Sequence, residues 1–372
     1  MAEEESEFEL EGFKKELESL FVSCSSEEYG LQSKLYCVRF CKLVEVYSGR
    51  WQVPLPQLQV LQTALCSFVQ ASACFPSDCE HVCYTLSSLA LSAFELLLFL
   101  NRNKILQDPL KKILDSFQEC FSQLERHQNI HLLQVGQIIR EKGPWTNPIL
   151  QAILKDSQLP RDEVDRYLSS EVPVFFELRV RYLLSSEMFT EAVVLAKTCS
   201  QHPVAGRHLF FRQAYLTCLL KASLPRHMHE EMSDIDGKDA VDIVCNTESE
   251  ESDETLLALC TAFLSQQLHR GDMYCMWDLV FIWSRLCLRV NPSKQAFLEE
   301  THRLLLSATN IRSIFSFIRV ILAEVSQELL GLLIFTAEIP AAIFVCSDVM
   351  GVVVVEDDVK SFGLYLRSGG LA

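Results

Sequence analysis

Two pairs of cysteines are spaced so that they could share a metal ion. Cys37 and Cys41 lie four residues apart, as do Cys79 and Cys83, so each pair would share one face of a helix. Two such faces could offer four thiolates to zinc. Structural zinc sites, however, use C-x2-C knuckles or mixed Cys and His sets, and the sequence has neither. We therefore expect these thiols to pack between helices, and we predict no metal and no other cofactor.

Two histidine pairs raise the same question. His127 and His131 are one helical turn apart near an expected helix end, and His227 and His229 lie in a polar stretch. Neither pair has a cysteine or a carboxylate at ligand spacing. A histidine near a helix C-terminus interacts favourably with the helix dipole, and an exposed one is simply solvated. We interpret all four as structural or surface residues.

Motifs typical of catalysis are missing from the sequence. It contains no G-x-x-x-x-G-K-[ST] loop and no G-x-G-x-x-G turn to cradle phosphates. It also lacks the G-x-S-x-G elbow that presents a serine nucleophile. Isolated Cys, His and Asp residues could still converge in space. We predict that the protein is not an enzyme, and we name no catalytic residue.

Large aromatic residues cluster in one short stretch. Tyr274, Met276, Trp277, Phe281 and Trp283 follow closely on one another, and Trp277 and Phe281 would share a helix face. Such a stripe usually packs in a core, and we favour packing for this one. If it were partly exposed, it would be a good anchor for a partner helix.

The composition indicates a large core beneath an acidic surface. Of the 372 residues, 49% are apolar and 22% are charged, and 33 basic against 49 acidic residues give a net charge of −16. Such a surface repels phosphate backbones, so we expect no direct nucleic-acid binding by this chain. The first twenty residues lack a secretory signal. We therefore expect the fifteen cysteines to be reduced thiols of a cytosolic or nuclear protein.

Signals for helix starts recur along the chain. The run Ser77–Glu80 has the form of a capping box. Asp108, Asn147 and Asn291 each precede a proline, which suits the first position of a helix. Apolar runs with the 3.6-residue period follow. The run Leu86–Leu100 is apolar nearly all round and predicts an inner helix; its fifteen residues fall short of the about 20 that span a bilayer.

One stretch predicts a complete helical hairpin. Pro173–Ser186 would form its first helix and Thr190–Ser200 its second, and the small residues Ala192 and Ala196 would allow close approach. The hairpin is similar to tetratricopeptide repeats but lacks their signature positions. Further helices are expected at His208–Lys221, Lys238–Asn246, Thr255–Arg270 and Tyr274–Val290. We predict an all-α fold, an irregular α-solenoid of stacked helical hairpins.

The chain divides by its patterning into three expected parts. They are an acidic, partly helical segment (1–35), a helical-repeat scaffold (36–325) and an apolar tail without caps or periodicity (326–372). The expected linkers are Ser23–Gly30, Pro225–Gly237 and Thr247–Glu254.

The apolar stretch Leu329–Val355 is long enough to span a bilayer. It contains Glu338 and Asp348, each of which would cost about 2.5–3.5 kcal/mol in a membrane. A membrane-tethered helical-repeat adaptor is therefore the alternative function rather than the favoured one.

Four long strings resemble the N-terminal region of the Rlf zinc-finger protein family. They are RWQVPLPQLQVLQTALCSF (Arg50–Phe68), GPWTNPILQAIL (Gly143–Leu154), FFELRVRYL (Phe175–Leu183) and GDMYCMWDLVFIWSRL (Gly271–Leu286). The resemblance covers approximately Tyr36–Val325.

The resemblance implies part of a nuclear transcription regulator that binds DNA through C2H2 fingers. This sequence has no C-x2–4-C…H-x3–5-H unit, so no DNA-binding residue of the family can be assigned here. Because the resemblance stops after Val325, we expect 326–372 to be an alternative C-terminus of a truncated product. The implied role is a protein-interaction scaffold in the nucleus, with transcription or chromatin factors as partners.

Overall fold

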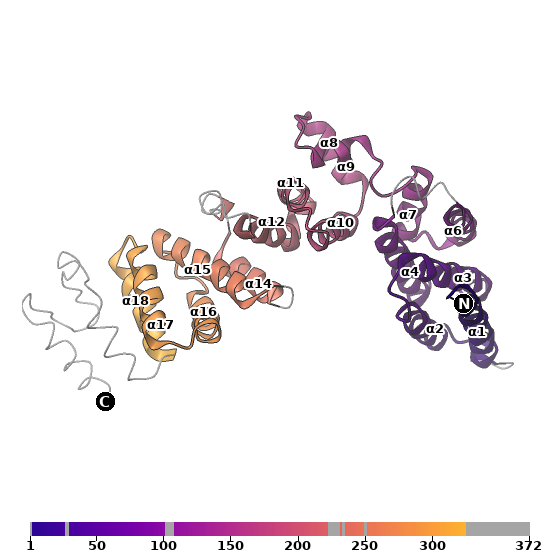
Figure 1. The fold of residues 1–372 in the computed structure, drawn as a ribbon, viewed down its shortest axis with the longest axis horizontal. Helices are drawn as coiled ribbons and strands as arrows, with labels where there is room; N and C mark the ends of the chain where they lie inside the picture. The colour runs from indigo at the N-terminus through magenta and orange to yellow at the C-terminus, as the bar shows by residue number, and fades with distance from the viewer. Residues whose placement is uncertain are drawn as a thin grey trace, which may run out of the picture. The chain divides into compact units, whose positions relative to one another are not determined.

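The computed structural model describes residues 2–26, 30–100, 108–221, 231–232, 235–248 and 251–324. The chain forms two compact units, Met1–His208 and Leu209–Ala372. Figure 1 shows the helices of both units in chain order. The all-α prediction is confirmed, because the described strands are limited to β1 (Ser25–Ser26) and β2 (Gly30–Leu31), a two-residue antiparallel pair. The expected tail, 326–372, lies outside the described residues.

The first unit is a series of short helices. Its elements are α1 (Ala2–Cys24), α2 (Ser33–Ser48), α3 (Pro54–Ser72), α4 (Glu80–Leu98), α6 (Leu110–Leu124), η1 (Glu125–His127), α7 (Ile130–Arg140), α8 (Pro148–Leu154), α9 (Arg161–Ser170), α10 (Pro173–Ser185), α11 (Phe189–Ser200) and η2 (Ala205–Arg207).

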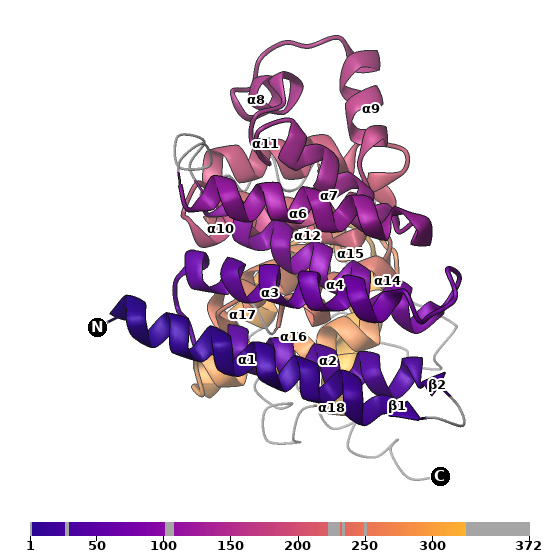
Figure 2. The same cartoon turned by 90° about the vertical axis from the view of Figure 1, so that its right-hand side faces the viewer.

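Three hairpins stack at the start of this unit. They pair α1 with α2, α3 with α4, and α6 with α7, and Figure 2 shows them as successive layers. Within the stack α1, α3 and α6 form one row, and α2, α4 and α7 form the other. The N-terminal helix belongs to this stack, because Phe13 and Leu17 are fully buried in the same core as Phe40 and Phe68. Each hairpin thus buries the apolar face of its neighbour.

Helix α4 is an inner helix, as its sequence predicts. It contacts α2, α3, α7 and α10, and Leu86, Ala90, Ala93 and Phe94 are fully buried. Among the described residues it is also the one helix long and apolar enough to cross a membrane. Half of the residues in its most apolar stretch are buried within the protein, as expected for a helix of the core. The segment Leu329–Val355, the basis of the membrane alternative, lies outside the described residues.

The hairpin predicted between Pro173 and Ser200 is confirmed as α10 and α11. Ala192 and Ala196 of α11 are fully buried, and the two helices are in close contact. The turn between them includes Glu187 in the left-handed region, with φ of 59°. Helix α11 also packs against α8, which continues the pairing of neighbouring helices.

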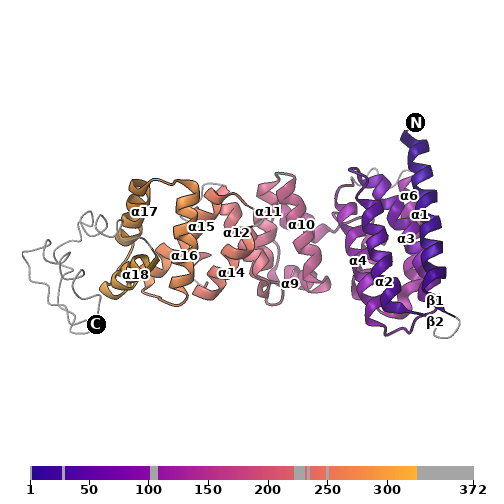
Figure 3. The ribbon, with the colours of Figure 1, turned by 90° about the horizontal axis from the view of Figure 1, so that it is seen from below.

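The second unit repeats the same arrangement. It contains α12 (Leu209–Lys221), α14 (Gly237–Thr247), α15 (Asp253–Arg270), α16 (Met276–Val290), α17 (Lys294–Leu306) and α18 (Ile311–Glu324). One row holds α12, α15 and α17, and the other holds α14, α16 and α18, as Figure 3 shows. Helix α15 is the inner helix, because it contacts each of the other five.

The boundary between the two units, at His208, falls inside the stretch 36–325 that the sequence treats as one scaffold. The helices expected within the second unit are confirmed. The sequence carried no signal for the division itself.

The helix-start prediction is confirmed at Asn147. Its side-chain oxygen accepts hydrogen bonds from the backbone N–H groups of Ile149 at 2.9 Å and Leu150 at 3.3 Å, and Pro148 holds the first helical position. This satisfies donors that no residue within the helix can reach.

The capping box predicted at Ser77–Glu80 is wrong. Helix α4 begins at Glu80 with Cys79 in the cap position, and no side chain caps it. Ser77 instead takes part in a tertiary contact, in which its carbonyl accepts a hydrogen bond from Nδ1 of His127 at 3.0 Å. A turn in which the N–H of Cys79 donates to the carbonyl of Pro76 at 3.4 Å delays the helix to Glu80, so Ser77 lies too early to cap it.

The predicted caps at Asp108 and Asn291 are also wrong. The carboxylate of Asp108 forms an ion pair with Lys112 at 3.3 Å. Helix α17 begins after Asn291, with Ser293 as its cap, and the hydroxyl of Ser293 accepts from the N–H of Ala296 at 3.4 Å. The prolines mark the turns correctly, but the helices start one or two residues beyond the expected positions.

A buried ion pair joins three parts of the first unit. Arg179 of α10 is almost completely buried, and its guanidinium donates to both carboxylate oxygens of Glu171 at 2.6 and 3.3 Å. Its Nε donates to the carbonyl of Pro144 at 3.1 Å. The guanidinium carbon also lies over the rings of Phe94 and Phe176, at 5.0 and 5.3 Å. The pair thus fixes the turn between α9 and α10 against α4.

Breaking this ion pair should destabilise the first unit strongly. Glu171→Gln leaves the charge of Arg179 buried without its partner, which should cost about 3–5 kcal/mol. Amide hydrogen exchange along α10 measures this as a lower opening free energy. The control is Asp165→Asn, which removes an exposed pair with Arg161 and should cost less than ~0.5 kcal/mol. Equal, small losses in both variants would contradict this account.

Candidate protein-interaction surface

The first cysteine pair lies beside Thr85 of α4 and within electrostatic reach of Cys79. The thiol of Cys41 donates to the hydroxyl of Thr85 at 3.7 Å. Cys37 is buried, and burial raises the pKa of its thiol to about 11. A thiol of that pKa is protonated at neutral pH and binds metal poorly. These side chains pack between α2 and the start of α4.

Two of the four histidines make structural contacts. Nδ1 of His127 donates to the carbonyl of Ser77, and its Nε2 accepts from Nε of Arg126 at 3.2 Å. Burial lowers the pKa of His127, which keeps the ring neutral for both contacts. His131 lies 3.0 Å from the hydroxyl of Ser87. The other pair, His227 and His229, lies outside the described residues.

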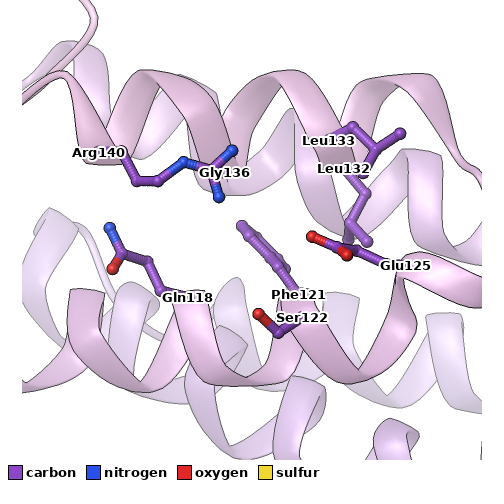
Figure 4. Close-up of a pocket in the computed structure, with 8 residues that line it drawn as sticks. All are labelled: Gln118, Phe121, Ser122, Glu125, Leu132, Leu133, Gly136 and Arg140. Carbon is purple, nitrogen blue, oxygen red and sulfur yellow. The ribbon is translucent and has the colours of Figure 1, made fainter.

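Within the part of the chain that the structure describes, no group of three or more His, Cys, Asp or Glu side chains could hold a metal ion. Two pockets of the first unit are also small. The pocket between α6 and α7 measures about 10 Å³, and the ring of Phe121 lies inside it, against Gly136 (Figure 4). A pocket lined by α8, α9 and α11 measures about 180 Å³. Both are below the ~300–1,000 Å³ of small-molecule sites.

The aromatic cluster of α16 divides between core and surface. Trp283 is fully buried, packs on Phe297 and Phe317 and donates its indole N–H to the hydroxyl of Thr261 at 3.1 Å. Trp277, by contrast, is 46% exposed.

The packing interpretation of Trp277 and Phe281 is therefore wrong. Phe281 is 38% exposed and Tyr274 is 59% exposed. The core face of α16 is instead supplied by Met276, Leu279, Val280, Trp283, Leu286 and Cys287. We call Tyr274, Trp277 and Phe281 the α16 aromatic surface. The guanidinium of Arg285 covers one side of it, 4.3 Å from the ring centre of Phe281.

The turn before α16 holds Tyr274 in place. Helix α15 ends at Gly271, whose φ of 75° suits glycine. The backbone N–H of Tyr274 donates to Asp272 at 3.0 Å, and its carbonyl accepts from Nε2 of Gln267 at 2.8 Å. Gly237, at the start of α14, approaches so closely that a Cβ there would lie 2.0 Å from the same carbonyl. Glycine is required for this contact.

Four carboxylates lie near the turn that carries Tyr274 and Cys275, at the start of α16. The set, which we call the acidic rim, comprises Asp236 and Asp242 of the α14 region, Asp272 of the turn, and Asp278 of α16. Burial first, and then the charges of Asp278, Asp236 and Asp242, raise the pKa of the Cys275 thiol.

The acidic rim carries unneutralised negative charge. Among the described residues, none of its four carboxylates forms an ion pair, whereas the neighbouring Asp239 pairs with Arg212 at 3.9 Å. The cations on the two helices are Lys238, Arg285 and Arg289. Of these, Arg289 is held by Glu248 and Asp253 at the far end of α16. The surface around Tyr274 and Trp277 is therefore apolar and acidic.

The comparisons with known proteins agree on one family. The family model described as zinc finger protein Rlf-like, TPR repeats, matches residues 231–339, a stretch that includes α14 to α18. Zinc finger protein 654 of Homo sapiens is 52% identical over 300 residues, which is 80% of this chain and 27% of that protein.

Zinc finger protein 654 of Mus musculus is also 52% identical over 300 residues. Zinc finger protein 292 of Homo sapiens is 38% identical over 292 residues, which is 78% of this chain and 11% of that protein. The chain thus spans about a quarter or less of the length of these relatives. No solved structure matches the chain.

Truncation of the two tryptophans of α16 should destabilise the second unit to very different extents. Trp283→Ala removes a fully buried ring and should destabilise the second unit by about 3–5 kcal/mol. Trp277→Ala removes a half-exposed ring and should cost less than ~1 kcal/mol. Both substitutions lie on α16, which packs against α15. Amide hydrogen exchange of α15 therefore measures the difference in stability between the two variants. Equal losses of protection would show that Trp277 belongs to the core.

Proposed function

The chain belongs to the family of Rlf-like zinc finger proteins with TPR repeats, and from this premise we propose that it is a protein-interaction scaffold of a nuclear transcription regulator. Stacked helical hairpins bury their apolar faces on one another and leave long helix faces free to bind other proteins. The observation that carries the proposal is the α16 aromatic surface, which lies within the segment that the family model matches.

The proposed partner is a basic, amphipathic helix with a large apolar side chain at its centre. Trp and Tyr are the residues that most often dominate binding energy at protein interfaces. Trp277 and Phe281 lie one turn apart, a spacing that suits the i, i+3 and i+4 anchors of a partner helix. The acidic rim would then contact Lys and Arg side chains on the edges of that helix.

The charge of the chain supports a protein rather than a nucleic acid as this partner. The formal charge is −16 over the sequence, and the acidic rim places part of that charge beside the anchor residues. A phosphate backbone would be repelled at this position. Any DNA binding would then be a property of C2H2 fingers, which this sequence does not contain.

The nuclear location and the identity of the partners as transcription or chromatin factors are further parts of this proposal. They rest on the printed names of the relatives, which are zinc finger proteins. The name of the family also supports a non-catalytic role, because it refers to zinc fingers and repeats rather than to a reaction.

A designed peptide tests the proposed recognition directly. The probe is a helical peptide of about 18 residues with Leu and Trp on one face and Lys and Arg on the others. We expect it to bind the full chain, and we expect Trp277→Ala combined with Phe281→Ala to weaken the binding at least ~10-fold. Asp242→Asn with Asp278→Asn should weaken it ~3–10-fold and reduce its dependence on salt. Isothermal titration calorimetry measures each affinity.

The matched control is Tyr84→Ala, which removes an exposed aromatic side chain of the first unit and should leave the affinity unchanged. A second peptide, with Glu in place of each Lys and Arg, should bind much more weakly. Equal binding of both peptides, or unchanged binding by the Trp277 and Phe281 double variant, would refute the proposed recognition.

A further inference from the structure

Two cysteines of the first unit bring their sulfur atoms together across a helix interface. Cys66 of α3 and Cys120 of α6 lie 54 positions apart in the sequence, yet their Sγ atoms are 3.7 Å apart. Both are free thiols. Among the described cysteines no other pair of sulfurs makes such a contact. The packing of the second hairpin on the third creates this pair.

The two thiols differ in access and in acidity. Cys66 is exposed, whereas Cys120 is buried. Hydrogen bonding with Cys120, and with the hydroxyl of Ser116 at 3.7 Å, lowers the pKa of Cys66, although burial and Glu119 act in the opposite direction. The same hydrogen bond and burial raise the pKa of Cys120, which keeps its proton. The accessible thiol of Cys66 is therefore the more acidic of the two, and it lies beside a buried thiol that holds its proton more tightly.

We propose that Cys66 and Cys120 form a redox-sensitive thiol pair that a peroxide closes into a disulfide between α3 and α6. Disulfide sulfurs are about 2.05 Å apart, so the two Sγ atoms must move about 1.7 Å closer. Rotation about the Cα–Cβ bonds moves each sulfur by that order of distance. The bond links the α3–α4 hairpin covalently to the α6–α7 hairpin.

The chemistry balances with hydrogen peroxide as the oxidant. The thiolate of Cys66 attacks one peroxide oxygen, an S–O bond forms and the O–O bond breaks, and the departing hydroxide takes up the proton that the Cys66 thiol had released to solvent. The sulfur of Cys120 then attacks the resulting sulfenic acid. An S–S bond forms, the S–O bond breaks, and hydroxide leaves with the proton of Cys120. Two thiols are oxidised while one peroxide is reduced to two waters.

The consequence of oxidation is a more rigid stack. In the reduced chain the second and third hairpins are held by packing and by hydrogen bonds, such as that from His127 to the carbonyl of Ser77. The disulfide restricts the unfolded chain by closing a long loop, and it therefore stabilises the folded unit. Reduction by a dithiol reverses the bond.

The test treats the full chain with hydrogen peroxide and counts thiols after denaturation. Wild type should lose two of its fifteen thiols, and peptide mapping should find Cys66 joined to Cys120, two hydrogens lighter than the reduced pair. Dithiothreitol should restore both thiols, and the oxidised chain should melt at a higher temperature than the reduced one.

Variants separate this pair from the other thiols. Cys66→Ser alters an exposed position, should keep the fold and should not form the disulfide. Cys245→Ser, at another exposed thiol, is the matched control and should form it as wild type does. The rate of Cys66 alkylation should reach half of its maximum at a pH below the ordinary pKa of a thiol in wild type, and at higher pH in Cys120→Ala, which loses the hydrogen bond.

The proposal fails if the mapped disulfide joins Cys66 to another cysteine or to a second chain. It also fails if both thiols end as separate sulfinic acids. A Cys66→Ser variant that still loses the same two thiols would overturn it as well.

Discussion

Each helix of a hairpin has two apolar faces and buries one of them against the other helix of the same hairpin. The second face must be covered by a neighbouring hairpin, so a chain of hairpins is stable when the hairpins stack. This constraint explains why inner helices such as α4 and α15 contact helices both before and after them in the chain. It also explains why α14, α16 and α18 form a row with one side left to solvent. The binding surface proposed for α16 lies on that side.

Polar contacts within the stack fix its geometry where apolar packing alone would leave freedom. Arg179 shows this, because its three donor groups reach Glu171 and the Pro144 carbonyl while its flat face lies on two rings. An apolar side chain of the same size could fill the space without defining those directions. Gly237 plays a comparable part in the second unit, where the close approach of α14 sets the position of Tyr274.

Much of the helical architecture could be predicted from the sequence, because periodicity, prolines and small residues act locally. The α10–α11 hairpin and the inner helix α4 are examples. The side of α16 that faces the core could not be predicted in the same way. Trp277 and Trp283 both lie on apolar stripes of one helix, and the neighbouring helices α15, α17 and α18 decide which stripe is covered.

The remaining features depend on residues that are distant in the sequence. The contact between Cys66 and Cys120 follows from the stacking of two hairpins, and no local spacing signals it. The hydrogen bond between His127 and the carbonyl of Ser77 has the same origin, because 50 positions separate the two residues. The expected division of the chain into 1–35, 36–325 and 326–372 remains a proposal, since the last part lies outside the described residues.

The central claim is that the exposed face of α16 is where this scaffold binds other proteins. A photo-crosslinking amino acid placed at position 277, in cells that make the chain, tests it most directly, with the same group at position 84 as the reference. The account predicts adducts that are specific to position 277 and map to basic helical segments of nuclear proteins. Identical adducts at both positions, or adducts to nucleic acid or acidic segments, would contradict it.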